Sequence, residues 1–302
     1  MLMFFKLALG NIIKNRRNTF SILLVVFICV FFMEFAVGYM DGFKQKLVND
    51  ALSQAGHITV YNREYYENLD FSPVDLNMEY SGPKLKELAD VEGVLDVRPE
   101  INFGAVANTE ADNKETMVKA IDYNNDAAVY KKRRDTVKEG RFIEAPDEIL
   151  IGVKMAKSLK AGIGDKIILM TMDQHGSMNA VEGKVAGIFR NYNPVEEERL
   201  IICGIAMAQR LLAIEGRVTE IIVKAKDYRQ AREVAAKIDK VAGEGNRAVP
   251  WQEEMAYMVP MLQMMDVAIA ILMGIIIFVA GMGITNSFLM NIMGRLPEFG
   301  VL

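Results

Sequence analysis

Residues 20–40, FSILLVVFICVFFMEFAVGYM, decide the fold, because Glu34 carries the only charge in the whole stretch. As a helix this stretch would rise about 32 Å, which is enough to cross a hydrocarbon core of ~30 Å. Residues 267–293, VAIAILMGIIIFVAGMGITNSFLMNIM, carry no charge and can span a bilayer with some tilt. Both stretches are too long for core helices of a soluble domain. The sequence therefore predicts a membrane protein with two transmembrane helices.

The charge balance and the residue counts exclude several classes of function. The chain has 302 residues with 35 Lys and Arg against 39 Asp and Glu, whereas a nucleic-acid-binding protein normally shows a strongly basic face. Two cysteines cannot build a disulfide scaffold, and two histidines leave little for a zinc site or a Ser-His-Asp enzyme. The sequence contains no G-x-x-x-x-G-K-[ST] loop for ATP. No catalytic, metal or cofactor site is therefore expected.

Basic residues flank both spans on the side away from the middle of the chain. They are Lys6, Lys14, Arg16 and Arg17 before the first span and Arg295 after the second. By the positive-inside rule both termini are expected in the cytoplasm, with residues 41–266 outside. The apolar residues of segment 1–19 recur at helical spacing, which predicts an interfacial helix; a plain extension of the first span is the alternative. A cleaved signal peptide is disfavoured, because the basic and apolar regions are both long.

The residues between the spans alternate strand and helix patterns, which predicts a mixed α/β extracytoplasmic domain. Its clearest helix is 227–242, with Asp227 as the N-cap and Gly243 as the residue that ends it. Short connections favour antiparallel pairing of the strands. The predicted strands are 57–61, 94–97, 101–107, 117–121, 148–152, 166–172, 181–189 and 218–225, and shorter helices are predicted at 84–89 and 153–159.

Several features of the external segment look like sites but have plainer explanations. Gly162 and Gly164 precede a strand, whereas phosphate binding needs a helix N-terminus after the glycines, so a turn is expected. His57 in a strand and His175 in a loop are expected to pack or to face solvent rather than to bind a metal. The basic run 131–134, KKRR, is expected to be a solvated surface, with contact to an acidic partner or to lipid headgroups as the alternative.

Methionines cluster just before the second span, in residues 251–266, WQEEMAYMVPMLQMMD. Unbranched thioether side chains make adaptable apolar surfaces, so one interpretation is a path for lipid chains or cargo. The other is packing of this stalk against the first span or a partner subunit. Pro260 is expected to kink the stalk. The methionines at roughly helical spacing are Met255, Met258, Met261, Met264 and Met265.

Several segments, in order, resemble one family of membrane proteins. Residues 7–27, LALGNIIKNRRNTFSILLVVF, are similar to the opening of FtsX-like ABC-transporter permeases. Residues 147–171, DEILIGVKMAKSLKAGIGDKIILMT, resemble the external domain of those permeases. Residues 181–231 and 249–255 resemble the lipoprotein-releasing, LolC/LolE-type branch. Residues 286–302, NSFLMNIMGRLPEFGVL, resemble the segment that begins the helix docked on the ATPase.

This resemblance implies a permease subunit that is not itself an enzyme. It implies a MacB-like periplasmic core fold for the external domain and a multi-pass location in a bacterial inner (plasma) membrane. A separate cytoplasmic ABC ATPase dimer would hydrolyse ATP, and a second permease subunit would complete the transporter. Lipoproteins would be extracted from the outer leaflet of the inner membrane and passed to a periplasmic carrier. The residues that resemble the ATPase-docking motif are Arg295, Glu298, Phe299 and Gly300.

Other interpretations stay open. An efflux permease of the macrolide-exporter type is the nearer alternative, and a two-span extracytoplasmic sensor, for which no output domain follows the second span, is the more remote one. Because family permeases continue through two more spans, the chain is expected to be truncated, a fragment or half of a split permease. The expected organisation is an interfacial helix at 1–19, a first span at 20–43, an external domain at 44–262, a stalk end and second span at 263–293 and a docking segment at 294–302.

Overall fold

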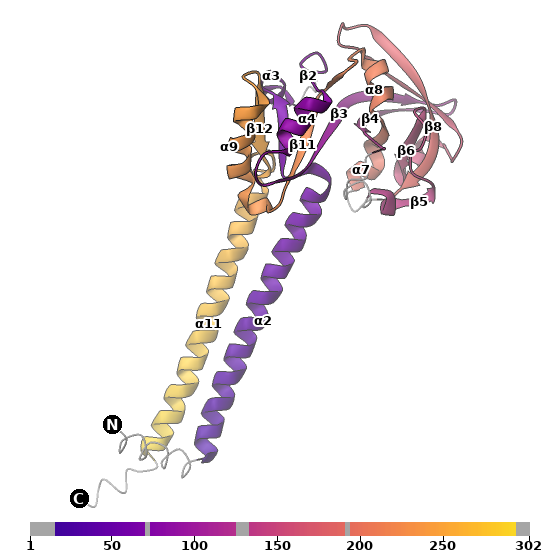
Figure 1. The fold of residues 1–302 in the computed structure, drawn as a ribbon. Coiled ribbons are helices and arrows are strands. Elements are labelled where there is room, and N and C mark those ends of the chain that lie inside the picture. The colour runs from indigo at the N-terminus through magenta and orange to yellow at the C-terminus, as the bar shows by residue number, and fades with distance from the viewer. Residues whose placement is uncertain (1–15, 70–72, 125–132, 191–193, 294–302) are drawn as a thin grey trace, which may run out of the picture. The chain divides into compact units, whose positions relative to one another are not determined.

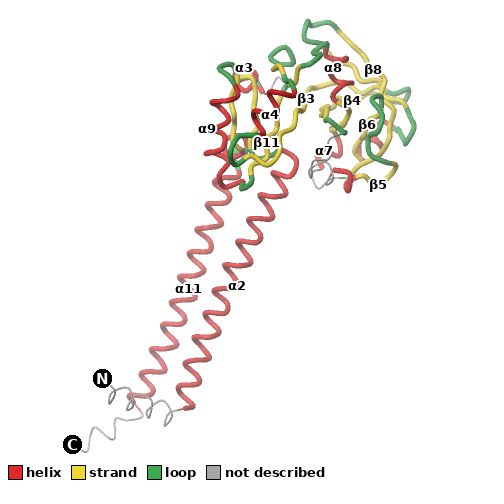
Figure 2. Tube along the Cα trace, viewed as in Figure 1, coloured by secondary structure: helices red, strands yellow, loops and turns green. Residues whose placement is uncertain are grey.

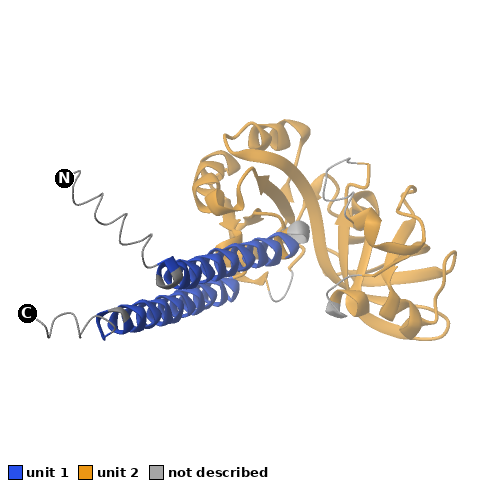
Figure 3. Ribbon diagram, turned by 90° about the horizontal axis from the view of Figure 1, so that it is seen from below, with its two compact units in different colours: residues 1–50, 256–302 blue, residues 51–255 orange. Residues whose placement is uncertain are grey.

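The structure is a computed structural model that describes residues 16–69, 73–124, 133–190 and 194–293. The chain divides into two compact units (Figure 3). One comprises Met1–Asp50 and Ala256–Leu302, and the other Ala51–Met255. Most of the interfacial helix predicted at 1–19, and all of the docking segment predicted at 294–302, lie outside the described residues.

The first unit contains two long helices (Figures 1 and 2). Helix α2 spans Arg16–Ala55 and helix α11 spans Met258–Met293. Their segments Thr19–Leu52 and Met258–Met290 are long and apolar enough to cross a membrane. Most of their described side chains are exposed, which is what lipid-facing helices require. Two candidate membrane helices are therefore present, as predicted.

The two helices touch along one stripe of α11. A Cβ atom added to Gly283 would lie 3.4 Å from Val25 Cγ1, and the Lys44 ammonium pairs with the Asp266 carboxylate. The half-buried residues of this stripe recur every three or four positions; they are Met265, Ile269, Met273, Ile276, Ala280 and Gly283. A stripe with that spacing lies on one face of a helix, so α11 packs against α2 through a single seam.

The second unit is built on a sheet of ten described strands. Their order is β12-β1-β11-β3-β4-β9-β6-β8-β5, and β7 pairs with both β3 and β8. Neighbours are antiparallel except for β4–β9 and β6–β8. A separate pair joins β2 to β10. The strands are β1 Ile58–Asn62, β2 Met78–Glu79, β3 Val94–Asn108, β4 Asn113–Ile121, β5 Val137–Gly140, β6 Glu148–Gly152, β7 Lys166–Met172, β8 Met178–Phe189, β9 Leu200–Gly204, β10 Arg217–Val218, β11 Glu220–Ala225 and β12 Asn246–Pro250.

Six of these strands close into a ring. The pairs run β3–β4–β9–β6–β8–β7 and return to β3, where Val106 lies opposite Met170. Side chains that point into the ring are buried and apolar; they include Phe103, Val118, Ile149, Ile151, Ile167, Leu169, Val185, Ile201 and Cys203. Burial raises the pKa of the Cys203 thiol to about 12, so this cysteine is a packing residue.

Strand β3 belongs to both halves of the second unit (Figure 1). Its first half pairs with β11, and its second half pairs with β4 and β7 in the ring. The sequence predicts two strands here, with a break around Pro99, and that prediction is wrong. Pro99 lies opposite Ile221 of β11, and pairing with β4 begins only at Glu100. The strand tolerates a residue without an N–H because one of its sides is open at that point.

Helices cover both halves of the sheet. Helix α9, Ala231–Ala242, packs against β12 and β1, and α8, Ile205–Leu212, contacts β3, β4, β7 and β8 of the ring. The sequence predicts one helix over 227–242, whereas the structure begins it as the 3-10 turn η2, Tyr228–Gln230, in which the Asp227 carboxylate accepts a hydrogen bond from the Arg229 N–H. The other short helices are α3 Arg63–Glu67, α4 Gly82–Ala89, α6 Val153–Leu159, α7 Pro194–Arg199 and α10 Trp251–Glu254.

Gly183 provides a test of the packing inside the ring. A Cβ atom at this position would meet Ile149 Cγ2 at 2.7 Å. We expect Gly183→Ala to lower the free energy of unfolding by about 1–3 kcal/mol, because the added methyl group overpacks an interior that side chains already fill. Gly104→Ala is the matched control, since nothing lies within 4 Å of its added Cβ. Denaturant unfolding of the purified chain followed by circular dichroism measures both; equal stability of the two variants would contradict the ring packing.

Candidate functional site

The chain leaves the sheet toward both long helices from one pair of strands. Helix α2 ends at Ala55 and β1 begins at Ile58, while α10 ends at Glu254 and α11 begins at Met258. Strand β12, which immediately precedes α10, lies antiparallel to β1, with Ile58 opposite Pro250. In the sequence, α2 is therefore connected to the sheet by β1, and α11 is connected to it by β12 and α10.

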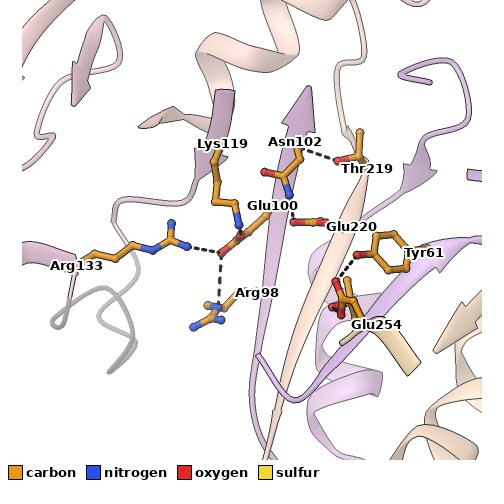
Figure 4. Close-up of polar contacts among 10 residues, drawn as sticks. Tyr61, Arg98, Glu100, Asn102, Lys119, Arg133, Thr219, Glu220 and Glu254 are labelled. Atoms are coloured by element: carbon orange, nitrogen blue, oxygen red, sulfur yellow. Dashed lines mark hydrogen bonds and ion pairs between the residues drawn. The ribbon is translucent and has the colours of Figure 1, made fainter. Parts of the chain in front are cut away.

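A carboxylate fastens these two connections to each other (Figure 4). The Tyr61 hydroxyl donates a hydrogen bond to Glu254 Oε1 at 2.8 Å, and Thr59 Oγ1 donates to Glu254 Oε2 at 3.0 Å. The Trp251 backbone N–H also donates to the His57 carbonyl at 3.0 Å. Hydrogen bonds to an ionised acceptor are stronger than those between neutral groups. We call the set Thr59, Tyr61 and Glu254 the Glu254 contact.

A row of polar residues runs from this contact across the sheet. In the register of the strands, Arg247 of β12 lies opposite Tyr61 of β1, and Tyr61 lies opposite Glu220 of β11. Glu220 in turn lies opposite Glu100 of β3. These four residues, which we call the polar row, link the strands next to the membrane helices to the strand that enters the ring. Directly opposed residues are the closest neighbours that a sheet provides.

Three cations surround Glu100 at the end of the row (Figure 4). Lys119 Nζ lies 3.4 Å from Glu100 Oε2, and Arg98 Nε and Arg133 Nη2 lie 3.9 and 4.0 Å from Oε1. Glu100 has no exposed surface, and Arg98 and Arg133 are buried. Glu220 accepts a hydrogen bond from the Asn102 side-chain amide beside this group. We call Arg98, Glu100, Lys119, Arg133 and Glu220 the charge cluster.

The two buried carboxyls of the cluster have opposite pKa shifts. Burial alone would raise the pKa of Glu100, but the three cations, Lys119 foremost, hold it below its usual value. Burial raises the pKa of Glu220 to about 8, and the nearby charges of Glu100 and Glu254 add to the effect against the attraction of Lys119. Glu100 is therefore ionised at neutral pH, whereas Glu220 is largely protonated.

The charge cluster links neighbouring strands of the sheet through buried charges. Buried ion pairs contribute little net stability, because desolvation offsets the attraction between the charges, but removing one partner is costly. Strands β3, β4 and β11 each contribute a member of the charge cluster, so a shift of one strand would separate these charges. Among the described residues, no group of three His, Cys, Asp or Glu side chains could hold a metal ion.

The methionines of the predicted lipid or cargo path do not share one helix. Met255 follows α10, residues 255–257 form a turn, and α11 starts at Met258. Met258 is buried, while Met261 and Met264 are exposed and Met265 is half-buried. Pro260 lies in the first turn of α11, where its missing N–H is not needed, and the stalk helix is interrupted at residues 255–257 just before it, so the kink at Pro260 stays a prediction.

The other predicted residues are placed as follows. The docking residues Arg295, Glu298, Phe299 and Gly300 lie outside the described residues, as do Lys131 and Lys132 of the basic run. For Arg133 the prediction of a solvated surface is wrong, because its guanidinium is buried beside Glu100. Arg134 lies over the Phe142 ring at 5.3 Å from its centroid. His57 is buried, and burial together with Lys224 lowers its pKa to about 4.

Sequence reasoning did not identify Tyr61, Glu254 or the charge cluster. One signal was available, since Glu220 precedes the apolar run IIV in one strand and Glu100 precedes Ile101 in another. A charged residue inside such a strand indicates a buried charge that needs partners. The partners themselves come from other strands, so their identity is a property of the tertiary fold.

The pKa of Glu220 predicts how stability changes with pH. Its folded pKa of about 8 lies above the ordinary 4.5, so its contribution is full below pH 4.5 and is lost as the pH rises through 8. His57 acts in the opposite direction, but only between about 4 and 6.5. Between pH 6.5 and 8.5 we therefore expect the melting temperature of the wild type to fall.

Glu220→Gln is expected to flatten that dependence, because a neutral amide keeps the polar contact without titrating. The slope it removes is at most about 1.4 kcal/mol per pH unit. Glu144→Gln, at an exposed carboxylate outside the cluster, is the control. Thermal unfolding of the three chains across this pH range provides the measurement, and parallel curves for Glu220→Gln and the wild type would refute the shifted pKa.

Comparison with known proteins identifies the family. The family model described as the MacB-like periplasmic core domain matches residues 19–241. The lipoprotein-releasing system transmembrane protein LolC of Buchnera aphidicola subsp. Schizaphis graminum is 23% identical over 173 residues, which cover 55% of this chain and 40% of that protein. An uncharacterized ABC transporter permease of Methanocaldococcus jannaschii is 25% identical over 184 residues, or 58% and 44% of the two chains. The chain thus spans less than half the length of these relatives.

Solved structures of similar domains were also found. The extracellular domain of the noncanonic ABC-type transporter YknZ from Gram-positive bacteria is 14% identical, with a TM-score of 0.43, and covers 64% of this chain and 100% of its own. The periplasmic region of MacB from Actinobacillus actinomycetemcomitans is 9% identical, with a TM-score of 0.45 and coverage of 65% and 89%. The family model itself covers well over half of the chain, from the first apolar helix to α9. The chain therefore belongs to the FtsX-like ABC-transporter permeases that carry a MacB-like periplasmic core domain.

Proposed function

We propose that this chain forms the N-terminal half of a permease subunit that moves lipoproteins out of the outer leaflet of the inner membrane. ATP hydrolysis would take place in a separate cytoplasmic ABC ATPase dimer. The observation that carries this proposal is the match of a MacB-like periplasmic core domain to a segment bracketed by two apolar helices. The lipoprotein-releasing name of the LolC relative supports the choice of cargo.

The proposed orientation has both ends of the chain in the cytoplasm and Ala51–Met255 outside. It is supported by Lys6, Lys14, Arg16 and Arg17 before the first apolar span and by Arg295 after α11. In this orientation the protein is a multi-pass component of the inner membrane, and a periplasmic carrier that receives the cargo would meet the second unit.

Force from the ATPase would reach the external domain through chain segments that the fold fastens together. The segment with Arg295, Glu298, Phe299 and Gly300 would dock on the ATPase and move α11. Helix α11 continues through the turn at 255–257 into Glu254, which Tyr61 and Thr59 hold. From there the polar row leads to β3 and the ring.

A second permease subunit is supported by the surfaces of the two long helices. Glu34 is exposed on α2 within the apolar segment, where a charge facing hydrocarbon costs about 2.5–3.5 kcal/mol. The small residues Gly274 and Gly281 lie on exposed positions of α11, with nothing within 4 Å of an added Cβ. Small residues permit close approach of another helix, so we propose that further membrane helices cover both surfaces.

The stalk methionines are proposed as a contact for cargo lipid only where they are exposed, at Met261 and Met264. Met258 is buried and Met255 and Met265 are half-buried, so these three are proposed only as neighbours of the path along the chain. An efflux permease of the macrolide-exporter type remains the second candidate, because the domain family takes its name from MacB.

Association with the ATPase tests the proposed function. The full reading frame is co-expressed with its cognate ABC ATPase, and we expect Glu298→Ala/Phe299→Ala to reduce the co-purified ATPase about tenfold. A loss of that size corresponds to about 1.4 kcal/mol of binding free energy. Glu110→Ala/Asp112→Ala, in an exposed loop of the external domain, is the matched control and should retain full recovery.

Recovery of the ATPase that is equal for all three chains would contradict the docking proposal.

The cargo is tested separately in liposomes that contain the assembled complex. ATP-dependent release of a fluorescent triacylated lipoprotein is the expected result. Stimulation of ATP hydrolysis by macrolides without lipoprotein release would favour the efflux alternative.

A further inference from the structure

Four neighbouring strands of the ring expose large apolar side chains on their outward side. Met117 of β4, Met172 of β7 and Met178 of β8 are 45%, 59% and 62% exposed. Val106 of β3 and Ile168 of β7 are exposed as well. The core of the ring does not need these side chains, because the alternate residues of the same strands fill it. An exposed apolar patch with a polar surround is typical of a surface that binds a ligand or a partner.

The register of the strands places the exposed methionines in a row across β4, β3, β7 and β8. Met117 lies opposite Gly104 of β3, and Met172 lies opposite Met178. The Thr171 hydroxyl donates a hydrogen bond to the Gly104 carbonyl at 2.7 Å, so β7 adjoins Gly104 on the side away from β4. Neighbouring strands are about 4.8 Å apart, so the row extends over about 14 Å. We call these three methionines, with Gly104 among them, the methionine row.

A groove of about 620 Å³ follows the methionine row. Gly104 lies in its floor, where an added Cβ atom would have nothing within 4 Å, so the missing side chain leaves space above the sheet. Most of the lining surface is apolar. Methionine side chains are unbranched and adaptable, so such walls can fit closely around a flexible ligand. The volume is in the range of about 300–1,000 Å³ that sites for small molecules occupy. The apolar lining residues are Ala105, Val106, Met117, Met170, Met172 and Met178.

One side chain of each charge lies at the β4 side of the groove. Arg199 and Glu115 both line the groove and are exposed. The Thr116 hydroxyl donates to the Arg199 carbonyl at 2.6 Å, which places Arg199 beside the residue that follows Glu115. Within the described part of the chain, neither Arg199 nor Glu115 forms an ion pair. The neighbouring Glu198 is already paired with Lys114 at 3.1 Å. The groove therefore offers one positive and one negative charge to a ligand.

We propose that this groove binds a single-chain zwitterionic amphiphile, with its alkyl chain along the methionine row and its head group on Arg199 and Glu115. A lysophospholipid with a phosphoethanolamine head belongs to this class. Its phosphate complements the Arg199 guanidinium, and its ammonium group complements the Glu115 carboxylate. The alkyl chain is stabilised because it leaves water for an apolar strip.

The extent of the apolar strip favours this ligand over a folded protein. A stable protein–protein interface buries about 800 Å² on each partner. Here the strip ends after a few side chains, at Asn108, Asn113 and Glu115. A single alkyl chain is narrow enough to lie on such a strip, and its head group accounts for the two charges that a purely apolar ligand would leave without a partner.

This binding site goes beyond the proposed function and does not rest on it. It is argued from the ring alone, whereas the cargo lipid is proposed to contact Met261 and Met264 of α11. Transport of a lipoprotein does not require that the groove be filled. An empty groove would therefore leave the proposed function intact, and failure of lipoprotein release would leave the groove intact.

Photo-crosslinking in the full chain tests the site. The chain is reconstituted in phosphatidylcholine nanodiscs with lysophosphatidylethanolamine that carries a diazirine in its alkyl chain, and the adducts are mapped by mass spectrometry. We expect adducts on the peptides that contain Met117, Met172 and Met178. Labelling of α2 and α11 reports how much probe the bilayer holds and is the internal standard. Unlabelled lysophosphatidylethanolamine should suppress the adducts in the groove, and phosphoethanolamine alone should not.

Gly104→Leu tests whether the chain occupies the space above Gly104. The added side chain has room on the folded sheet but fills the groove, so labelling of the groove should fall about tenfold or more. Lost contact with two methylene groups is enough for a change of about that size. Gly245→Leu is the matched control, because this glycine of the turn before β12 also has nothing within 4 Å of an added Cβ. Its labelling should equal that of the wild type.

The head group is tested with a monoacylglycerol probe that has the same chain and no charge. The wild type should be labelled about two- to fivefold more by the zwitterionic probe, which is the contribution that exposed ion pairs make. Arg199→Gln/Glu115→Gln should remove this preference. Lys166→Gln/Glu182→Gln, at an exposed ion pair of the ring outside the groove, is the control and should keep it.

Three results would overturn the proposal. The first is equal labelling of the groove in the wild type and Gly104→Leu. The second, which needs no variant, is labelling of the wild type that unlabelled lysophosphatidylethanolamine does not suppress. The third is equal labelling of the wild type by the charged and uncharged probes. Labelling by a photoactivatable apolar peptide, with none by the lysolipid, would overturn it in favour of a protein partner.

Discussion

The hydrogen bonds from Tyr61 and Thr59 to Glu254 are the constraint on which the rest of the arrangement depends. They join the first strand after one membrane helix to the last turn before the other. Without them, the β1–β12 pair and the Trp251 N–H bond to His57 would still connect the two segments, but no side chain of α10 would be fixed to β1 by a charged acceptor. Because two hydroxyl groups donate to the two oxygens of one carboxylate, the position of the Glu254 side chain relative to β1 is fixed by two hydrogen bonds and not by one.

Strand β3 connects the strands near the Glu254 contact to the ring. A single strand of 15 residues pairs with β11 in one half of the second unit and with β4 and β7 in the ring. The polar row ends on it at Glu100, where three cations converge. Backbone pairing along β3 and the buried charges around Glu100 therefore connect the half of the unit that contains β1 and β12 to the ring.

The sequence predicts those elements whose signal is local. The two membrane helices follow from unbroken apolar length. Strand β7 occurs at the residues predicted, 166–172, because the glycine turn at 162–165 marks where it begins. Strand β9, Leu200–Gly204, was missed because its five residues follow the charged run of α7. The Glu254 contact and the charge cluster could not be predicted, since their members come from separate strands and meet only in the folded sheet. The same holds for Arg133, which reads as part of a solvated basic run until its partner Glu100 is known.

Hydrogen exchange in the wild type and in Glu254→Ala tests the central claim, that the two helix connections are coupled to β3 through the Glu254 contact and the polar row. The account predicts faster amide exchange in β1, β12 and residues 94–100 of β3 in Glu254→Ala, because the contact and the start of the row are lost. Amides of the β7–β8 pair, which lie beyond the row, should exchange as in the wild type. Faster exchange confined to α10, with β1 and β3 unchanged, would contradict the coupling.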